Sequence, residues 1–349
     1  MGPSDRLPTR LAECGQYSRV HPTDDGRLVT LDEFQAAAAR IAGVAVRTPL
    51  LRFRASGDGL TFVKPECLQP TGSFKIRGAY NTLSQMSAEE RARGVVTHSS
   101  GNHAQAIARS ARLLGIRALV VMPNDAPAVK VAGVRADGAE IEFVGPTNPE
   151  RVARAHEIAE HDGMVLVSSA NHMGVVAGQG TIGLEIVTQL ADMGVTDAPV
   201  ILVPVGLGGH AAGVSTAVKA LRPDARVIGV EPEIAADARD SLAARRVTPW
   251  PAEETAKTIA DGLRAEAVAE IPFRHLLANL DGIVTVSEAE IGAAVAIGAR
   301  EIHVVLEPSG AVTLAALLNR WSDLPAGPLV AVLSGGNVDT ERYLEFLRA

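Results

Sequence analysis

From residue 94 onward, the chain alternates short runs rich in Val, Ile and Leu with longer stretches of helical periodicity. The short runs lie at 95–97, 118–122, 140–144, 164–167, 200–205, 227–230 and 329–333. Gly, Pro and Asp mark most of the links between runs and helical stretches, as is typical of β-α units whose parallel strands are buried between helices. The sequence therefore predicts an α/β fold with mostly parallel sheets covered by helices on both faces.

Two segments depart from this alternation. Residues 1–44 contain no strand-like run, but Thr30 followed by Glu33 matches a capping box and predicts a helix at 31–42. Residues 248–269 show no clear periodicity, and we expect them to form a long excursion near a functional face. At about 150 residues per domain, the 349 residues indicate two domains.

The composition excludes several classes of protein. Hydrophobic residues make up 47% of the chain, which excludes disorder. Lys and Arg number 33 against 40 Asp and Glu, and aromatic residues are only 3%, so neither a nucleic acid nor a membrane surface is an expected partner. Cys14 and Cys67 are too few for a disulfide framework and the chain starts without an apolar signal segment, so we expect a cytoplasmic protein.

The stretch TGSFKIRGA, residues 71–79, is the most informative for chemistry. It places Lys75 beside a Gly/Ser turn at the expected start of a helix. Phe74 and Ile76 are apolar neighbours, and apolar surroundings lower the pKa of a lysine and so favour the neutral amine that a Schiff base requires. A solvated surface lysine is the alternative that residue type alone favours.

Three further stretches follow expected strands, at the carboxyl edge where open α/β sheets bind ligands. The SSGNH stretch at 99–103 suits a carboxylate at a helix start, although a plain N-cap turn uses the same residues. The VGLGGH stretch at 205–210 matches neither the dinucleotide fingerprint nor a P-loop, and predicts a small phosphate held by amides. Ser334 follows the last short run and either contacts a ligand or caps a helix.

Together, these four stretches resemble the threonine dehydratase and serine racemase family, the fold type II pyridoxal-phosphate enzymes. The similarity runs from about residue 48 to 339 and includes AGQGT at 177–181, TIADG at 258–262 and EPSG at 307–310. It implies a small domain at 94–171, inserted into a larger domain formed by 1–93 and 172–349, with pyridoxal 5'-phosphate in the cleft between them. Relatives pair as dimers, so the resemblance also implies a homodimer.

The resemblance assigns roles to individual residues. Lys75 matches the lysine that bonds the cofactor, Phe74 the neighbour packed on its ring, and Asn102 the partner of the ring hydroxyl. Ser334 matches the residue that faces the pyridine nitrogen. The phosphate would bind the loop of Gly206, Leu207, Gly208, Gly209 and His210. The substrate carboxylate would bind the loop of Ser99, Ser100, Gly101, Asn102 and His103.

The chain departs from the family pattern at two loops. Relatives usually have four consecutive glycines followed by Leu or Met in the phosphate loop, whereas Leu207 interrupts the run here and His210 ends it. Leu207 disfavours a left-handed backbone at its position, and His210 either donates to the phosphate or packs. The SANHMG loop at 169–174 also differs from its counterpart, and Asn171 is the residue in it that we expect near the substrate.

A metal site is predicted after the run at 227–230. Glu231 and Asp237 offer two carboxylates, and Ala235 offers a carbonyl between them. Oxygen ligands suit Mg²⁺ or Ca²⁺, and the set also resembles the divalent-cation site of the racemase branch. Interaction of the carboxylates with a helix dipole is the alternative.

The activity implied by the resemblance is dehydration and deamination of a small β-hydroxy amino acid, L-threonine or L-serine, to a 2-oxo acid and ammonia. Lys75 would remove the α-proton as a general base. Serine racemase is an alternative because Ser100 stands where an acid on the opposite face is needed. The altered loop at 169–174 leaves hydroxyaspartate or a hydroxyectoine-derived substrate open. A non-catalytic amino-acid-binding protein is disfavoured, because it needs neither Lys75 nor Ser334.

Overall fold

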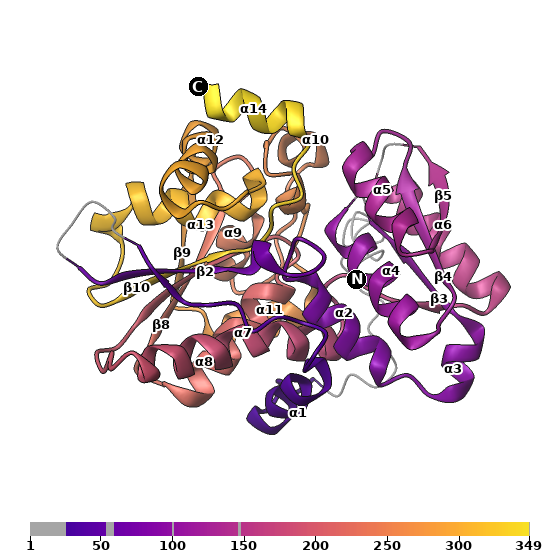
Figure 1. Cartoon of the computed structure of the whole chain (residues 1–349), viewed down its shortest axis with the longest axis horizontal. Helices are drawn as coiled ribbons and strands as arrows, with labels where there is room; N and C mark the ends of the chain where they lie inside the picture. Colours follow the sequence, from indigo (N-terminus) through magenta and orange to yellow (C-terminus); the bar gives the residue numbers. More distant parts are fainter. Residues whose placement is uncertain (1–25, 54–58, 100, 146–147, 349) are drawn as a thin grey trace, which may run out of the picture.

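The computed structural model describes residues 26–53, 59–99, 101–145 and 148–348, and forms two lobes, each built on one sheet (Figure 1). The larger sheet has six strands in the order β1-β2-β10-β7-β8-β9. Its strands are β1 Leu51–Arg52, β2 Thr61–Pro65, β7 Val200–Pro204, β8 Arg226–Pro232, β9 Gly282–Val286 and β10 Leu329–Leu333. Among the strand pairs of the described residues, only β1–β2 is antiparallel.

The smaller sheet has four parallel strands in the order β5-β4-β3-β6. Its strands are β3 Val95–His98, β4 Ala118–Pro123, β5 Glu140–Val144 and β6 Val165–Leu166. All four lie between β2 and β7 in the sequence, so the chain leaves the six-stranded lobe and later returns to it. The predicted α/β class with mostly parallel sheets is confirmed, while the domain limits at 93/94 and 171/172 stay a prediction.

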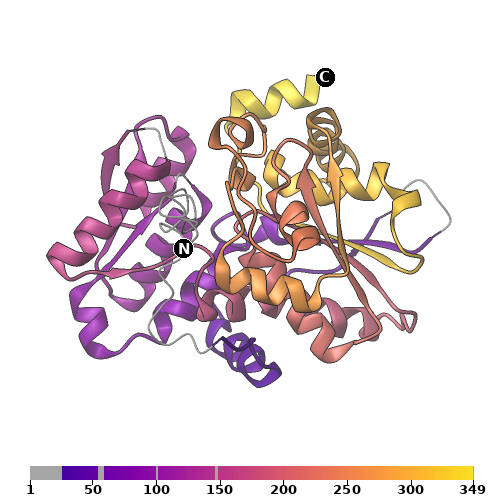
Figure 2. The same cartoon turned by 180° about the vertical axis from the view of Figure 1, so that it is seen from behind.

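Helices cover both faces of the six-stranded sheet, as expected for buried parallel strands. The helices of this lobe are α1 Leu31–Ile41, α7 Met173–Asp192, α8 Gly209–Leu221, α9 Asp237–Ala244, α10 Ala252–Thr255, α11 Glu270–Asn279, α12 Glu288–Ile297, α13 Pro308–Asn319 and α14 Thr340–Arg348. One core cluster joins α1, α7, α8 and α11 to the sheet, and a second joins α12 and α13 to the opposite face. Both views show α14 on the outside of this lobe (Figure 2).

The four-stranded sheet is covered in the same way. Helices α2 Lys75–Ser84, α4 Asn102–Leu114 and α5 Ala128–Ala136 pack on one face, and α6 Asn148–Asp162 packs on the other. The short α3 Ala88–Arg93 leads into β3. Helix α2 also packs on α7 of the larger lobe, so this helix, which begins at Lys75, connects the two halves of the molecule.

Side-chain caps explain where α1, α3, α7 and α12 begin. The helix predicted at 31–42 is confirmed as α1, and Thr30 Oγ1 accepts a hydrogen bond from the Glu33 N–H at 3.4 Å. Helix α7 begins at Met173, where His172 Nδ1 accepts from the Gly174 N–H (3.0 Å) and caps the helix.

Two other features bear on the sequence predictions. Cys67 is a free, buried thiol, and Cys14 lies outside the described residues. None of the described helices is long and apolar enough to cross a lipid bilayer.

Candidate active site

A cavity of about 770 Å³ lies between the two lobes. Residues that directly follow β3, β7 and β10 line it, so it opens at the carboxyl edge of both sheets. Residues 252–266, within the predicted excursion, form another part of its wall through α10 and the short turn η4 Asp261–Leu263. The cavity therefore gathers the four motifs that the sequence singled out.

Lys75 lies at the start of α2 and reaches into this cavity. Its Nζ donates to the Ser169 carbonyl at 3.3 Å and lies 5.1 Å from the centre of the Phe74 ring. Part of the side chain faces the cavity, and protein surrounds the rest. Burial lowers the pKa of Lys75 to about 8, and the Glu307 carboxylate opposes that shift. A surface lysine is thus excluded.

A buried ion network fixes helix α2 two residues beyond Lys75. Arg77 Nε lies 2.8 Å from Glu66 Oε2, and Arg77 Nη1 lies 2.7 Å from Glu185 Oε1. Lys64 Nζ completes the network at 2.6 Å from Glu185 Oε2. These residues were not predicted from the sequence, although the charged residues Lys64 and Glu66 inside the apolar stretch 61–68 are a usable signal.

The loop at 206–210 joins β7 to α8 and forms a concave backbone surface. Gly208 has φ of +88°, and a Cβ there would lie 2.7 Å from Val268 Cγ2. The first N–H groups of a helix lack intrahelical acceptors, and no described residue accepts a hydrogen bond from the N–H groups of Leu207, Gly208 or Gly209. These groups fit a phosphate at the positive end of α8.

The expected strain at Leu207 is absent, which corrects the sequence analysis. Within the described part of the chain, Arg245 and His303 are the only non-glycine residues with positive φ. The left-handed residue of the loop is Gly208, so Leu207 keeps an ordinary backbone. Its side chain is accommodated because the left-handed conformation falls one residue later.

His210 stacks on Phe74, with ring centroids 4.0 Å apart and planes inclined by 16°. Both of its ring nitrogens are buried without a partner among the described residues. Burial lowers the pKa of His210 to about 3, so the ring is neutral. Of the two roles left open, packing is the one that its contact with Phe74 supports, and donation to a phosphate stays a prediction.

The amide of Asn102 is held from both sides. Its Nδ2 donates to Glu307 Oε1 at 2.5 Å, and its Oδ1 accepts from Asn337 Nδ2 at 2.8 Å. Ser334, the other predicted contact of a cofactor ring, donates from Oγ to the Ser309 carbonyl at 3.3 Å. Glu307 was not singled out as a site residue by the sequence analysis. Burial raises the pKa of this carboxyl to about 7.

The loop that is predicted to bind the substrate carboxylate lies at the start of α4. Ser99, Gly101, Asn102 and His103 all line the cavity, and Ser100 lies outside the described residues. The Gly101 N–H donates to Ser99 Oγ at 3.2 Å. His103 Nε2 lies 3.4 Å from the Val167 carbonyl oxygen, and burial lowers the pKa of His103 to about 3. This histidine is neutral and faces the backbone.

Asn171 does not join these residues. Its Oδ1 accepts from the Ile271 N–H at 3.0 Å, and among the residues of its loop Ser169 and Ala170 are the ones that line the cavity. The amide of Asn171 thus ties the loop to α11. Its predicted contact with the substrate receives no support from this placement.

Glu231 and Asp237 meet at the start of α9, away from the cavity lining. The N–H groups of Ala238 and Arg239 donate to Glu231 Oε1 (3.1 Å) and Oε2 (2.9 Å), so this carboxylate caps the helix. The Val268 N–H lies near enough to lower the pKa of Asp237, but neither Asp237 oxygen meets the geometry of a hydrogen bond with the described residues. Burial raises the pKa of both carboxyls, that of Asp237 to about 7.

An uncompensated buried carboxylate of this kind fits a cation. Among the described residues, no group of three or more His, Cys, Asp or Glu side chains could hold a metal ion. A site here would therefore need a carbonyl as a third ligand.

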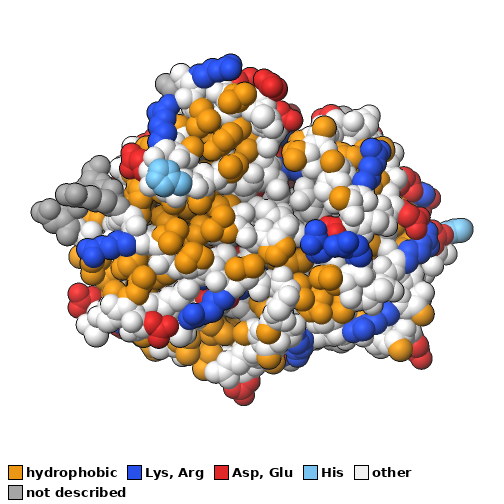
Figure 3. Space-filling view, in the orientation of Figure 1, with side chains coloured by type: hydrophobic (Ala, Val, Ile, Leu, Met, Phe, Trp, Pro, Cys, Tyr) orange, Lys and Arg blue, Asp and Glu red, His pale blue; other side chains and the backbone are white. Residues whose placement is uncertain are grey.

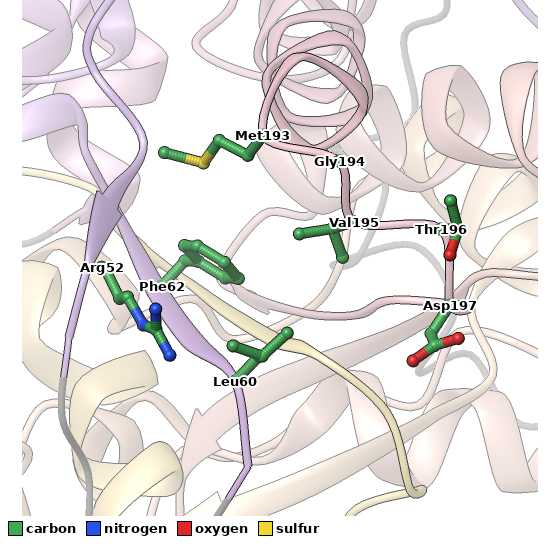
Figure 4. Close-up of a pocket in the computed structure, with 8 residues that line it drawn as sticks. All are labelled: Arg52, Leu60, Phe62, Met193, Gly194, Val195, Thr196 and Asp197. Carbon is green, nitrogen blue, oxygen red and sulfur yellow. The ribbon is translucent and has the colours of Figure 1, made fainter.

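A second hollow lies at the opposite edge of the six-stranded sheet (Figure 4). Leu60 and Phe62 at the start of β2 line it, together with residues 193–197, which precede β7. Because this hollow lies at the amino ends of the strands, it is remote from Lys75, and none of the predicted site residues line it.

The lowered pKa of Lys75 predicts how fast the apoprotein takes up pyridoxal phosphate. At pH 7 about one Lys75 amine in ten is neutral, against roughly one in three thousand for an ordinary lysine. The uptake rate should rise about tenfold per pH unit below pH 8 and level off above it. Stopped-flow absorbance measures this, with N-acetyl-lysine as the reference amine in the same buffers. A rate still rising at pH 10 would contradict the shift.

Comparisons with known proteins agree with this geometry. A family model described as pyridoxal-phosphate dependent enzyme matches residues 41–335. The chain is 40% identical to an L-threo-3-hydroxyaspartate ammonia-lyase of Pseudomonas sp, over 89% of this chain and 96% of the relative. It is 36% identical to the serine racemase of Schizosaccharomyces pombe, over 93% of this chain and 99% of the relative.

A solved structure gives the same result. The threonine deaminase of T.th. superimposes with a TM-score of 0.83 at 42% identity, covering 89% of this chain and 99% of that one. The chain therefore belongs to the family of pyridoxal-phosphate dependent enzymes, with the fold type II architecture that threonine dehydratases, serine racemases and hydroxyaspartate ammonia-lyases share.

Proposed function

We propose that the protein dehydrates and deaminates a small β-hydroxy amino acid, L-threonine or L-serine, to a 2-oxo acid and ammonia. The observation that carries this proposal is the Lys75 amine, with a pKa lowered to about 8, in a cavity between the lobes. Pyridoxal phosphate, when bound, supplies an electron sink that makes the α-hydrogen of an amino acid acidic.

The residues of the chain divide the remaining work. Lys75 Nζ takes up the α-proton, because its lowered pKa keeps the amine partly unprotonated near neutral pH. The start of α4 binds the substrate carboxylate through backbone N–H groups and the helix dipole. Gly208 and its neighbours bind the cofactor phosphate at the start of α8, and Ser334 offers a hydroxyl to the ring nitrogen. A hydroxyl holds a proton there less well than a carboxylate, which favours prompt loss of the β-hydroxyl.

The polar lining of the cavity supports a small substrate side chain. Arg264 donates from Nε and Nη2 to the Thr258 carbonyl, at 3.0 and 2.8 Å. Arg342 is paired with Glu345, and Lys130 is paired with Asp261. Because these three cations are engaged, they offer little to a second carboxylate, and threonine or serine fits better than an acidic analogue.

One observation favours a second candidate, L-threo-3-hydroxyaspartate. Arg151 on α6 also lines the cavity, and a guanidinium there suits the extra carboxylate of this amino acid. The matched ammonia-lyase of Pseudomonas sp is named for that substrate. Serine racemase remains the third candidate, with Ser100 as the acid on the opposite face.

A substrate panel tests the proposal. The purified holoenzyme should form 2-oxo acid from L-threonine and L-serine, and Lys75→Ala should lower the rate by a factor of about 10³ or more and abolish the absorbance of the lysine-bound cofactor. Lys257→Ala is the matched control, since this lysine is exposed just beyond the end of α10 and paired with Glu254. Undiminished 2-oxo acid formation by Lys75→Ala would sink the proposal.

The same panel separates the three candidates. Faster turnover of L-threo-3-hydroxyaspartate than of L-threonine, lost selectively in Arg151→Gln, would establish the second candidate. D-serine formed from L-serine and detected by chiral chromatography would establish the racemase, and Ser100→Ala should then remove D-serine alone.

We also propose that Glu231, Asp237 and the Ala235 carbonyl bind a divalent cation, Mg²⁺ or Ca²⁺. The support is the buried Asp237 carboxylate without a full hydrogen bond, next to a second buried carboxylate. Cations with a preference for oxygen ligands compensate such a pair. The cation would hold the start of α9 against β8.

Thermal unfolding tests the metal site independently of activity. Adding Mg²⁺ or Ca²⁺ to chelator-treated protein should raise the melting temperature by about 2–4 °C. Asp237→Asn should abolish this response, because it removes the charged ligand. Glu233→Gln, at a half-exposed carboxylate on the same turn, should keep it. Equal metal responses in both variants would rule the site out.

The homodimer stays a proposal, supported by an apolar patch on the six-stranded lobe. Apolar side chains gather over this lobe on the face shown in Figure 3. Of the exposed large apolar side chains that the structure describes, Leu68 and Val305 in this lobe are 49% and 50% exposed. They lie close together, because Cys67 and Val305 both lie against Gly336. We propose that a second copy of the chain covers this patch, consistent with the usual role of exposed apolar surfaces.

Light scattering coupled to size exclusion tests the dimer. The wild-type protein should have twice the mass of one chain, and Leu68→Glu should shift it to the monomer. Leu113→Glu alters an equally exposed leucine on the other lobe and should leave the dimer intact. A wild-type protein with the mass of one chain would refute it.

A further inference from the structure

We propose that Lys130 is a positioning residue for this chemistry: it clamps the four-stranded lobe onto the six-stranded lobe and, through Glu307, orients the Asn102 amide. The inference rests on the proposed function for its kinetic consequence. Its structural part, a buried cation that bridges two lobes, stands on the geometry alone.

Lys130 spans the gap between the lobes. It lies on α5 of the four-stranded lobe, and its side chain is only 5% exposed. Nζ lies 2.5 Å from Asp261 Oδ2 and 3.5 Å from Glu307 Oε2. Both carboxylates belong to the six-stranded lobe, on η4 and at the N-cap of α13. One ammonium thus holds two elements of the opposite lobe.

Two glycines leave room for this bridge. A Cβ on Gly101 would lie 3.0 Å from Lys130 Cε and 3.1 Å from its Nζ. A Cβ on Gly335 would collide with Glu307 Oε1. These glycines lie in the loops that follow β3 and β10, so both loops are shaped around the bridge. A larger residue at either position would displace the charged groups.

The charges explain why the lysine is needed. Asp261 and Glu307 bring two carboxylates to one buried site, and burial raises the pKa of Glu307 to about 7 while Lys130 opposes that shift most strongly. Without Lys130, the two carboxylates would face each other with the Lys75 amine as the remaining cation near Glu307. Glu307 would then take up a proton, because uncompensated like charges do not persist in a buried site.

In its ionised form, which predominates above a pKa of about 7, Glu307 helps to set the orientation of Asn102. An ionised carboxylate only accepts hydrogen bonds, so Oε1 selects the NH₂ end of the Asn102 amide. Asn337 donates to the other end, Asn102 Oδ1, and its own amide is fixed by a bond to the Thr71 carbonyl at 2.8 Å. A protonated Glu307 accepts a hydrogen bond less well, so the Asn102 amide would be held firmly at its Oδ1 end alone.

A second branch starts at Asp261. Ser309 Oγ donates to Asp261 Oδ1 at 3.2 Å and accepts from the Gly262 N–H at 2.8 Å. The Ser309 carbonyl accepts from Ser334 Oγ at 3.3 Å. Lys130 therefore connects to two of the residues predicted to contact the cofactor ring, to Asn102 through Glu307 and to Ser334 through Asp261 and Ser309.

The test compares Lys130→Met with Lys130→Arg in the holoenzyme, with Lys257→Met as a control at an exposed lysine. Lys130→Met should lower kcat/KM for L-threonine about tenfold to hundredfold, as expected when reacting groups are misplaced. It should also shift the absorbance maximum of the bound cofactor, because the Asn102 amide loses the ionised Glu307 as its acceptor. Lys130→Arg keeps a cation and should restore most of the activity and the original spectrum.

Hydrogen exchange provides a readout that needs no turnover. In Lys130→Met, backbone amides of α5 and of residues 258–264 should exchange faster, while those of α7 and α8 remain unchanged. Kinetic constants within twofold of wild type would overturn the proposal. So would a loss of activity with an unchanged cofactor spectrum and faster exchange throughout the chain, since that pattern marks a general loss of stability.

Two further variants keep the proposal testable if Lys130→Met does not fold. Asp261→Asn removes the shorter ion pair but keeps an amide oxygen that can accept from Ser309 Oγ, so it should speed exchange in α5 without a spectral shift. Glu307→Gln should shift the spectrum with little change in exchange, and the reverse pattern in these two variants would refute the division of roles. If the wild-type protein binds the cofactor but turns over no hydroxy amino acid, the proposed function fails. The hydrogen-exchange and absorbance results would still test whether Lys130 holds the two lobes together.

Discussion

The buried pairing of Arg77 with Glu66 and Glu185 is the interaction on which the arrangement of the site depends. Helix α2 contacts both lobes, and its first residue is Lys75. Two cations, Arg77 and Lys64, face two carboxylates in this network, so the cluster is neutral. Removing one member would leave a buried charge uncompensated, which costs about 3–5 kcal/mol. Net gain in stability is small for such clusters; what this one provides is a single position for the helix.

Because this network joins residues that are far apart in the sequence, it also limits how much of the structure can be predicted from local sequence patterns. The alternation of apolar runs and helical stretches located β3 to β8 and β10, because each of these strands is rich in Val, Ile or Leu and is bounded by turn residues. Strand β2 was not located, since Lys64 and Pro65 interrupt its apolar character, and the burial of Lys64 depends on Glu185, far away in the chain. Local patterns cannot show a partner that only the folded chain supplies.

The same reasoning separates the site residues. Lys75 was identified because its apolar neighbours are adjacent in sequence. Glu307 and Lys130 were not, because their importance arises where the two lobes meet and brings together residues 177 positions apart. Leu207 was expected to strain the phosphate loop, but Gly208 takes the left-handed conformation. The sequence of that loop does not determine which of its residues takes the left-handed conformation.

Strand β10 lies between β2 and β7, although it is the last strand of the described chain. Until residue 333 has been synthesised and has left the ribosome, the six-stranded sheet has a gap at its centre, and the loop that holds Ser334 does not exist. The four-stranded lobe is complete in sequence far earlier, at residue 166. During biosynthesis, the residues that line the cavity from the four-stranded lobe are therefore available before those from the six-stranded lobe are complete. Cofactor binding then becomes the last step of folding. Before that step, the unpaired edges of β2 and β7 are exposed and prone to misassociation.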